Sequence, residues 1–106
     1  MTHWEIAHSE IRDGFKIELA LAPSDTAPSD TTPETSRRID NGDLLWFDAR
    51  VTASRHGVVL GTDYLGGCSY DSVAEFVRDS YYEDLVAEAL GDARRMIEKL
   101  EMPEAA

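Results

Sequence analysis

A stripe of apolar side chains at helical spacing runs through the C-terminal part of the chain and constrains the fold more than any other feature. Its members are Tyr82, Val86, Ala89, Ala93, Met96, Ile97 and Leu100. Residues three and four apart lie on one face of an α-helix, so the stripe predicts a long helix with one buried side. Gly91 lies opposite the stripe and could mark a break or kink. Such a helix needs an apolar surface to cover, which the rest of the chain must supply.

A shorter helix is predicted just before this one. Ser72 and Glu75 form a capping box, in which two side chains satisfy free backbone N–H groups, so a helix should start near Val73. Ser80 and Glu83 repeat the same pattern. The repeat implies a bend and the start of the long helix.

Residues 45–64 predict a β-hairpin. Apolar and polar residues alternate from Leu45 to Ala53, which is typical of a strand with one buried face. A four-residue loop, 54–57, would pair Ala53 with Val58. The inner face would then continue with Val58, Leu60, Thr62 and Tyr64. In this register Trp46 faces away from the core, and the glycine-containing segment 65–70 follows as a loop.

Residues 4–22 predict another hairpin around the turn Asp13-Gly14. After the turn, the alternation of Phe15, Ile17, Leu19 and Leu21 with polar or small residues gives a strand with one buried face. A two-residue loop would place Arg12, Glu10, His8 and Ile6 on that same face. Two charges there require either a β-bulge that brings Ile11 inward or an edge position that lets the charges reach water.

The predicted order is therefore β-β-β-β-α-α in a single domain, residues 1–106. We expect an α+β fold: a four-stranded antiparallel sheet of two hairpins, covered on one face by two C-terminal helices. Residues 23–36 are rich in Pro, Ser, Thr and Asp and contain no large apolar side chain. They predict a flexible connecting loop, although loops of this length are sometimes binding elements.

Composition narrows the class of protein. The chain carries 21 acidic and 10 basic residues, a net charge of −11, and one cysteine. This charge argues against direct binding to nucleic acid or to an anionic membrane. The N-terminal residues have neither a basic nor an apolar run, so we expect no signal peptide and a cytoplasmic protein. The cysteine count excludes an internal disulfide and fits a reducing compartment.

The sequence contains no recognisable catalytic or cofactor motif. Cys68 follows two glycines, but its acidic neighbourhood disfavours a thiolate. His3 and His8 would lie on opposite faces of a strand and cannot share a metal. Asp48 and Asp63 lie on strands that could pair, which alone does not define an acid–base site. We expect no enzyme, no cofactor and no metal.

The acidic residues gather in the helical region. Between Leu60 and Ala93 the only basic residue is Arg78, and the acidic ones are Asp63, Asp71, Glu75, Asp79, Glu83, Asp84, Glu88 and Asp92. Such a surface can imitate DNA phosphates and attract a basic groove. The alternative is ordinary matching to the helix dipole, because acids favour helix starts and the last turns carry Arg94, Arg95 and Lys99.

Aromatic residues beside charge are the second candidate for a binding surface. Trp46 should point off the core face, and Tyr70 and Tyr81 lie near helix starts. Aromatic side chains are common at the centres of protein interfaces. The alternative for Trp46 is that the long loop covers it.

Part of the chain, from Gly42 to Leu100, resembles a known group of proteins. The resemblance is carried by Trp46-Phe47, by the run Asp63-Tyr64-Leu65-Gly66-Gly67-Cys68-Ser69-Tyr70, and by Tyr81-Tyr82-Glu83-Asp84. These segments are similar to small acidic accessory proteins of bacterial phages and mobile elements. Proteins of that kind include inhibitors of restriction enzymes and of CRISPR surveillance complexes, some of them DNA mimics. The resemblance implies no catalytic residues.

We therefore expect a non-enzymatic inhibitor that binds a basic protein surface, such as the nucleic-acid-binding groove of a defence complex. The partner-binding residues would be Glu75, Asp79, Asp84, Glu88 and Asp92 for charge, with Trp46 or Tyr81 as apolar anchor. The alternative is a structural or regulatory module without nucleic-acid mimicry. It would form a homodimer through the first-strand edge or through the outer sheet face around Trp46.

Overall fold

The computed structural model of the chain describes residues 3–23, 33, 37–38 and 45–101. Its elements are β1 (Glu5–Arg12), β2 (Phe15–Pro23), β3 (Leu45–Arg55), β4 (Val58–Tyr70), α2 (Val73–Arg78) and α3 (Ser80–Glu101). The strands form one antiparallel sheet in the order β1-β2-β3-β4. The predicted α+β architecture is confirmed. Most of the loop expected at 23–36 lies outside the described residues.

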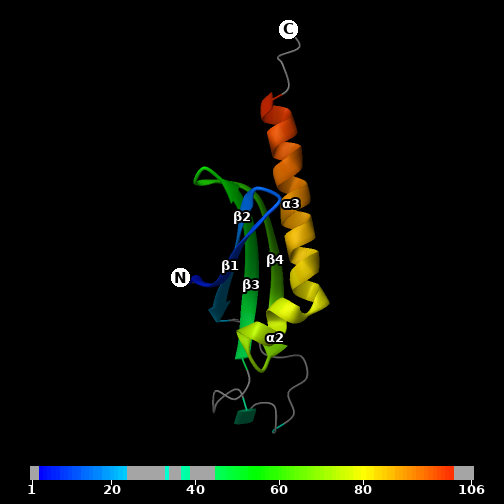
Figure 1. The fold of residues 1–106 in the computed structure, drawn as a ribbon. Coiled ribbons are helices and arrows are strands. Elements are labelled where there is room, and N and C mark those ends of the chain that lie inside the picture. The colour runs from blue at the N-terminus through cyan, green and yellow to red at the C-terminus, as the bar shows by residue number, and fades with distance from the viewer. Residues whose placement is uncertain (1–2, 24–32, 34–36, 39–44, 102–106) are drawn as a thin grey trace.

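The two helices lie on one face of the sheet, and α3 runs along β3 and β4 (Figure 1). Tyr82, Val86, Ala89 and Ala93 of the predicted stripe are buried against the sheet. The helix continues without a break through Gly91, because a single glycine costs only about 1 kcal/mol in a helix that is otherwise well packed. Its last turns extend past the strands (Figure 1), and there Leu100 is 70% exposed.

The start of α2 follows the predicted capping box, but the start of α3 does not. Ser72 accepts a hydrogen bond from the backbone N–H of Glu75 at 3.2 Å, as expected. At α3 the helix already includes Ser80, whose hydroxyl donates a hydrogen bond to the Asp79 carboxylate at 3.2 Å. Asp79 thereby links the end of α2 to the beginning of α3.

Both hairpins close with two-residue turns. Asp13 and Gly14 have φ of 55° and 81°, and His56 and Gly57 have φ of 54° and 79°. Positive φ at both turn positions matches the right-handed twist of the flanking strands. The first turn is the predicted one. The four-residue loop predicted at 54–57 is wrong, because β3 continues to Arg55 and β4 starts at Val58.

A bulge just after the second turn changes which face of β4 is buried, because the shorter turn alone would keep the predicted alternation. Val59 pairs with Ser54, Gly61 pairs with Ala53, and Leu60 forms a bulge between them. Residues opposite one another in an antiparallel pair share a face, so Gly61 faces α3, whereas Thr62 and Tyr64 face outward. Of the residues predicted for the inner face, Leu60 packs against the core. Tyr64 is instead 61% exposed.

The segment 65–70 is the end of β4 and not the predicted loop. A second bulge places Asp48 opposite Gly66 and Gly67, and the Asp48 Oδ1 atom accepts the N–H of Gly67 at 3.0 Å. Gly67 has φ of 66°, a conformation that favours glycine, and the Trp46 ring lies against it. The strand therefore passes through the glycine pair with only a local irregularity.

Strand β1 lies at the edge of the sheet, where the charged side chains of Glu10 and Arg12 can reach water. A bulge lies between Ile6 and His8, but Ile11 does not turn inward and is 73% exposed. Glu10 and Arg12 stay on the helix side, opposite Ile17 and Phe15. Of the two explanations open from sequence, the edge position is correct and the inward Ile11 is wrong.

Candidate interaction surfaces

Three of the predicted acidic residues point to solvent. Glu75 lies on α2, and Asp84 and Glu88 lie one turn apart on the side of α3 away from the sheet. All three are exposed, and none takes part in an ion pair within the described part of the chain. Like charges at i and i+4 repel each other by a few tenths of a kcal/mol, so this pair does not stabilise the helix.

The other two predicted acidic residues have partners inside the molecule. Asp79 accepts a hydrogen bond from the Tyr70 hydroxyl at 2.8 Å, and this bond lowers the pKa of the Asp79 carboxyl. Asp92 pairs with Arg95 one turn further along α3. The structure thus assigns Asp79 a role at the junction of the two helices and partly neutralises Asp92.

Several acidic residues elsewhere are paired with arginines distant in sequence. Glu83 pairs with Arg12 at 2.7 Å, Asp13 with Arg94 at 2.5 Å, and Asp71 with Arg38 at 2.5 Å. These pairs reduce the local negative potential around them. Within the described residues, the unpaired exposed carboxylates of the two helices are therefore Glu75, Asp84 and Glu88, with Glu98 and Glu101 further along in the last turns of α3.

The two predicted aromatic anchors lie in different places. Tyr81 is 54% exposed at the start of α3 and lines a hollow of about 280 Å³ with the Gly66–Tyr70 end of β4. Trp46 is half-buried on the face of the sheet that the helices leave open, with its ring over Gly67. Only Tyr81 belongs to the same layer as the acidic helices.

A polar network joins β1 to α3. The Tyr82 hydroxyl donates to Glu10 at 2.7 Å, and Glu10 is also bonded by Arg12 and His8. Arg12 in turn donates two hydrogen bonds to Glu83. The bond from Tyr82, with those from Arg12 and His8, holds the pKa of Glu10 below its usual value despite partial burial. Sequence reasoning missed this contact, because Tyr82 looked only like a member of the apolar stripe.

The open face of the sheet carries a stack of rings around an arginine. The Arg50 guanidinium lies 4.7 Å from the centre of the Trp4 ring, and Trp4 meets Tyr64 edge-on with centroids 6.1 Å apart. The Arg50 Nε atom is buried, and no described residue lies within hydrogen-bonding geometry of it. Cation–π contact of this kind contributes about 0.5–2 kcal/mol, more when water is excluded. Trp4 thus tethers the residues before β1 to strands β3 and β4.

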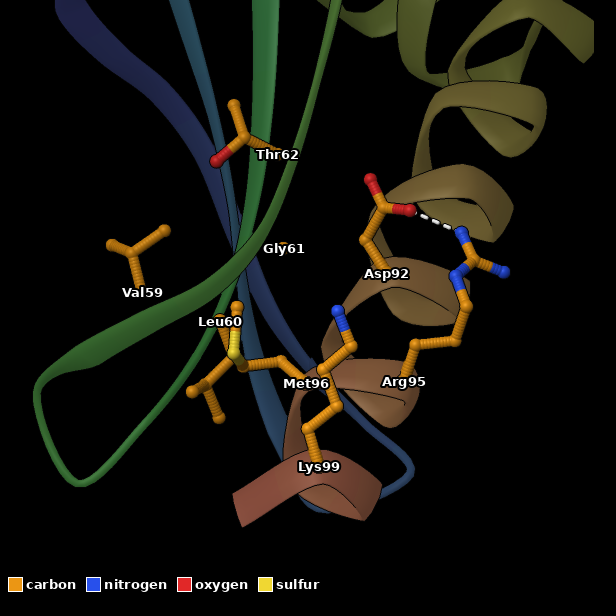
Figure 2. Close-up of a pocket in the computed structure, with 8 residues that line it drawn as sticks. All are labelled: Val59, Leu60, Gly61, Thr62, Asp92, Arg95, Met96 and Lys99. Carbon is orange, nitrogen blue, oxygen red and sulfur yellow. Dashed lines mark hydrogen bonds and ion pairs between the residues drawn. The ribbon is translucent and has the colours of Figure 1, made fainter.

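A groove of about 380 Å³ lies between the start of β4 and the C-terminal half of α3. Figure 2 shows β4 approaching α3 at Gly61 before the hairpin tip bends away, with Val59 and Thr62 directed away from the helix. Met96 gives the groove an apolar side, Arg95 and Lys99 border it with positive charge, and Asp92, which also lines it, is paired with Arg95. The groove therefore lacks the acidic character of the helix surface beyond it.

The candidates for catalysis are not assembled. Cys68 is 4% exposed, and burial followed by the Asp48 charge raises the pKa of its thiol to about 11, so it is not a thiolate at neutral pH. Asp48 and Asp63 do not face one another, because Asp63 pairs with Val51 on the helix side. Among the described residues, no group of three His, Cys, Asp or Glu side chains is placed to hold a metal ion.

Comparison of the chain with protein-family models, with curated proteins and with solved structures finds no match. Within the described segments, no helix combines the length and apolar character needed to cross a membrane.

Proposed function

We propose that this protein is a non-catalytic binding module that presents an acidic surface of α2 and α3 to a basic surface on another protein. The observation that carries the proposal is the pair Asp84 and Glu88. Both are exposed, one turn apart and, among the residues that the structure describes, without a cationic partner, whereas Glu83 and Asp92 on the same helix are paired with arginines. Repulsion within the pair is relieved when a cationic partner binds.

Tyr81 supplies the apolar part of this surface. It lies on the turn of α3 next to Asp84, is 54% exposed, and borders the hollow beside the Gly66–Gly67 bulge. An aromatic side chain beside desolvated charge is the usual composition of an interface centre. The proposal therefore assigns charge to Glu75, Asp84 and Glu88, and contact area to Tyr81.

An arginine-rich peptide is a suitable probe for this surface. We expect the protein to bind it with an affinity that falls as salt is added, because exposed charges are screened. The variant Asp84→Asn/Glu88→Gln should bind about three- to tenfold more weakly. Its matched control is Glu98→Gln/Glu101→Gln, which changes the net charge equally at exposed sites of the same helix. Equal affinity and equal salt dependence for the two double variants would overturn the proposal.

The most specific form of the proposal is an inhibitor that occupies a nucleic-acid-binding groove of a phage-defence enzyme. The net charge of −11 supports it, because an acidic protein competes with DNA for the same basic groove. A competition experiment with DNA distinguishes such an inhibitor from a protein that binds basic proteins in general. A defence nuclease bound by the protein should lose affinity for duplex DNA, and full retention of DNA binding by the complex would exclude the specific form alone.

A further inference from the structure

The outer edge of β1 has no neighbouring strand within the described part of the molecule. Because the turn at Asp13-Gly14 has two residues, Arg12 and Phe15 form the first hydrogen-bonded pair of the hairpin. Alternate residues of β1 therefore direct their backbone N–H and C=O groups to the open edge. Following the register with β2, these residues are Ile11, Ser9 and, beyond the bulge at Ala7, Ile6.

The side chains of β1 sort into two rows. Opposite the core residues of β2 lie Glu5, His8, Glu10 and Arg12, and on the open face lie Ile6, Ser9 and Ile11. Ala7 is the extra residue of the bulge. Because of it, Ile6 lies on the same face as Ser9 and Ile11, and Glu5 lies on the same face as His8, Glu10 and Arg12. Ile6 and Ile11 are 62% and 73% exposed, which is unusual for two isoleucines on one edge.

These rows are complementary to themselves. If a second β1 pairs antiparallel about a two-fold axis at Ser9, Glu5 lies opposite Arg12 and His8 lies opposite Glu10. On the open face Ile6 lies opposite Ile11. Apart from Ser9, which faces its own copy at the axis, every facing pair then joins opposite charges, the histidine and a carboxylate, or two apolar side chains, each of which stabilises a sheet. The backbone groups of Ile6, Ser9 and Ile11 meet their counterparts in the same arrangement.

Neighbouring registers lack this match. Sliding the strands by two residues in one direction brings Glu5 opposite Glu10. Sliding them the other way brings Glu10 opposite Glu10 and His8 opposite Arg12. Like charges directly opposite one another destabilise a strand pair, so charge selects the register centred on Ser9.

The other edge of the sheet is less suited to pairing. Strand β4 carries two bulges and the glycine pair Gly66-Gly67, features that twist an edge away from a flat partner. Its outer row includes the bulky Tyr64, which is held against Trp4. The two edges therefore differ in their capacity to add a strand.

We infer that two copies of this chain associate through β1, antiparallel and centred on Ser9, to form one continuous sheet across the dimer. The interface uses the open edge of β1 and leaves Asp84 and Glu88 free. It is independent of the proposed binding of basic proteins, and its tests use no basic partner.

Sedimentation over a range of concentrations should show a monomer–dimer equilibrium. Each substitution acts twice in a symmetric dimer. Glu5→Lys places an ammonium group opposite the Arg12 guanidinium of the second copy, so it should raise the dimer dissociation constant about tenfold or more. Glu98→Lys is the matched control, because it makes the same charge change at another exposed site. A monomer at every concentration, or equal effects of the two variants, would overturn the inference.

A cysteine at the axis tests the register directly. Opposed residues of a hydrogen-bonded antiparallel pair have Cα atoms about 5.5 Å apart, within the range of a disulfide. Under mild oxidation Ser9→Cys should form a cross-linked dimer, and the native Cys68 does not compete because it is 4% exposed. Ile11→Cys is the control, since two copies of residue 11 would lie about 13 Å apart. A dimer that Ser9→Cys fails to link, or that both variants link equally, contradicts the two-fold at Ser9.

Discussion

The two edge strands of the sheet are attached to α3 in different ways. Strand β4 touches the helix through its backbone: a Cβ atom built on Gly61 would lie 1.9 Å from the carbonyl oxygen of Ala89 and 2.8 Å from the nitrogen of Ala93. Strand β1 is reached by long polar side chains, through Tyr82–Glu10 and Glu83–Arg12. The close backbone contact fixes the distance between β4 and α3 and leaves no room for an added side-chain atom. The hydrogen bonds between side chains allow the distance between β1 and α3 to adjust, and they depend on the protonation of the carboxylates.

The largest effect should follow from breaking the β4 contact. Gly61→Ala places a methyl group against helix backbone, which cannot move as a flexible side chain can, so unfolding free energy should fall by about 2–4 kcal/mol. Urea denaturation followed by circular dichroism measures the loss. Gly66→Ala is the control on the same strand, because its added Cβ would lie 3.5 Å from Asp48 Oδ1, an ordinary contact. If the two variants are equally stable, the backbone contact does not set the position of α3.

Removing the hydroxyl that reaches β1 should have a smaller effect. Tyr82 is fully buried, and Tyr82→Phe leaves its ring in place but removes the bond to Glu10. We expect a loss of about 1–2 kcal/mol in urea denaturation, the usual cost of a hydrogen bond to a charged group. Tyr81→Phe, at an exposed hydroxyl, should change stability by less than about 0.5 kcal/mol. A neutral result for Tyr82→Phe would mean that the bond from Tyr82 to Glu10 does not contribute to the attachment of β1.

The β1 contact should also depend on pH. The pKa of Glu10 is lowered in the folded state by Tyr82, Arg12 and His8. A lowered pKa means that the stabilisation is complete above the unfolded-state value near 4.5 and is lost as pH falls through the folded-state value. Between neutral pH and pH of about 3, stability should fall less steeply in Tyr82→Phe than in the wild type. Parallel curves would show that this bond does not perturb the titration of Glu10.

The smallest effect is expected at the tip of the first hairpin. Arg94 and Asp13 form an ion pair at 2.5 Å, but both side chains are more than half exposed. Exposed pairs contribute about 0–1 kcal/mol and are screened by salt, so Arg94→Gln should change stability by no more than about 0.5 kcal/mol. Denaturation at low and high salt checks this. A loss as large as that from Tyr82→Phe would place this pair among the main attachments of β1.

The sequence predicted the layers of this fold but not the register of β4. Period-two and helical patterns identified β2, β3 and α3, because each buries one face along most of its length. The bulge at Leu60 shifted the face of residues 61–65 until the second bulge at Gly66-Gly67 reversed the shift, and no sequence pattern marked it. Gly61 gave the one available signal, since glycine within a strand often marks close approach of another backbone.

For the candidate binding surface too, the sequence predicted which residues are exposed but not which of them form ion pairs. The sequence predicted Asp84 and Glu88 as part of an acidic surface of the helical region, and the structure leaves both side chains exposed. It could not reveal that Glu83 pairs with Arg12 or that Asp79 binds Tyr70, because these contacts depend on how α2 and α3 cross the sheet. The pairing of charges across elements is a property of tertiary structure.

The final turns of α3, which run past the ends of the strands, create a gradient of protection along one continuous helix. Amide protons near Ala89 are shielded by the sheet and should exchange with solvent only when the domain opens, whereas those near Leu100 should exchange through local fraying. A fluorophore or an affinity tag attached after residue 101 would therefore label or immobilise the molecule without disturbing either edge of the sheet.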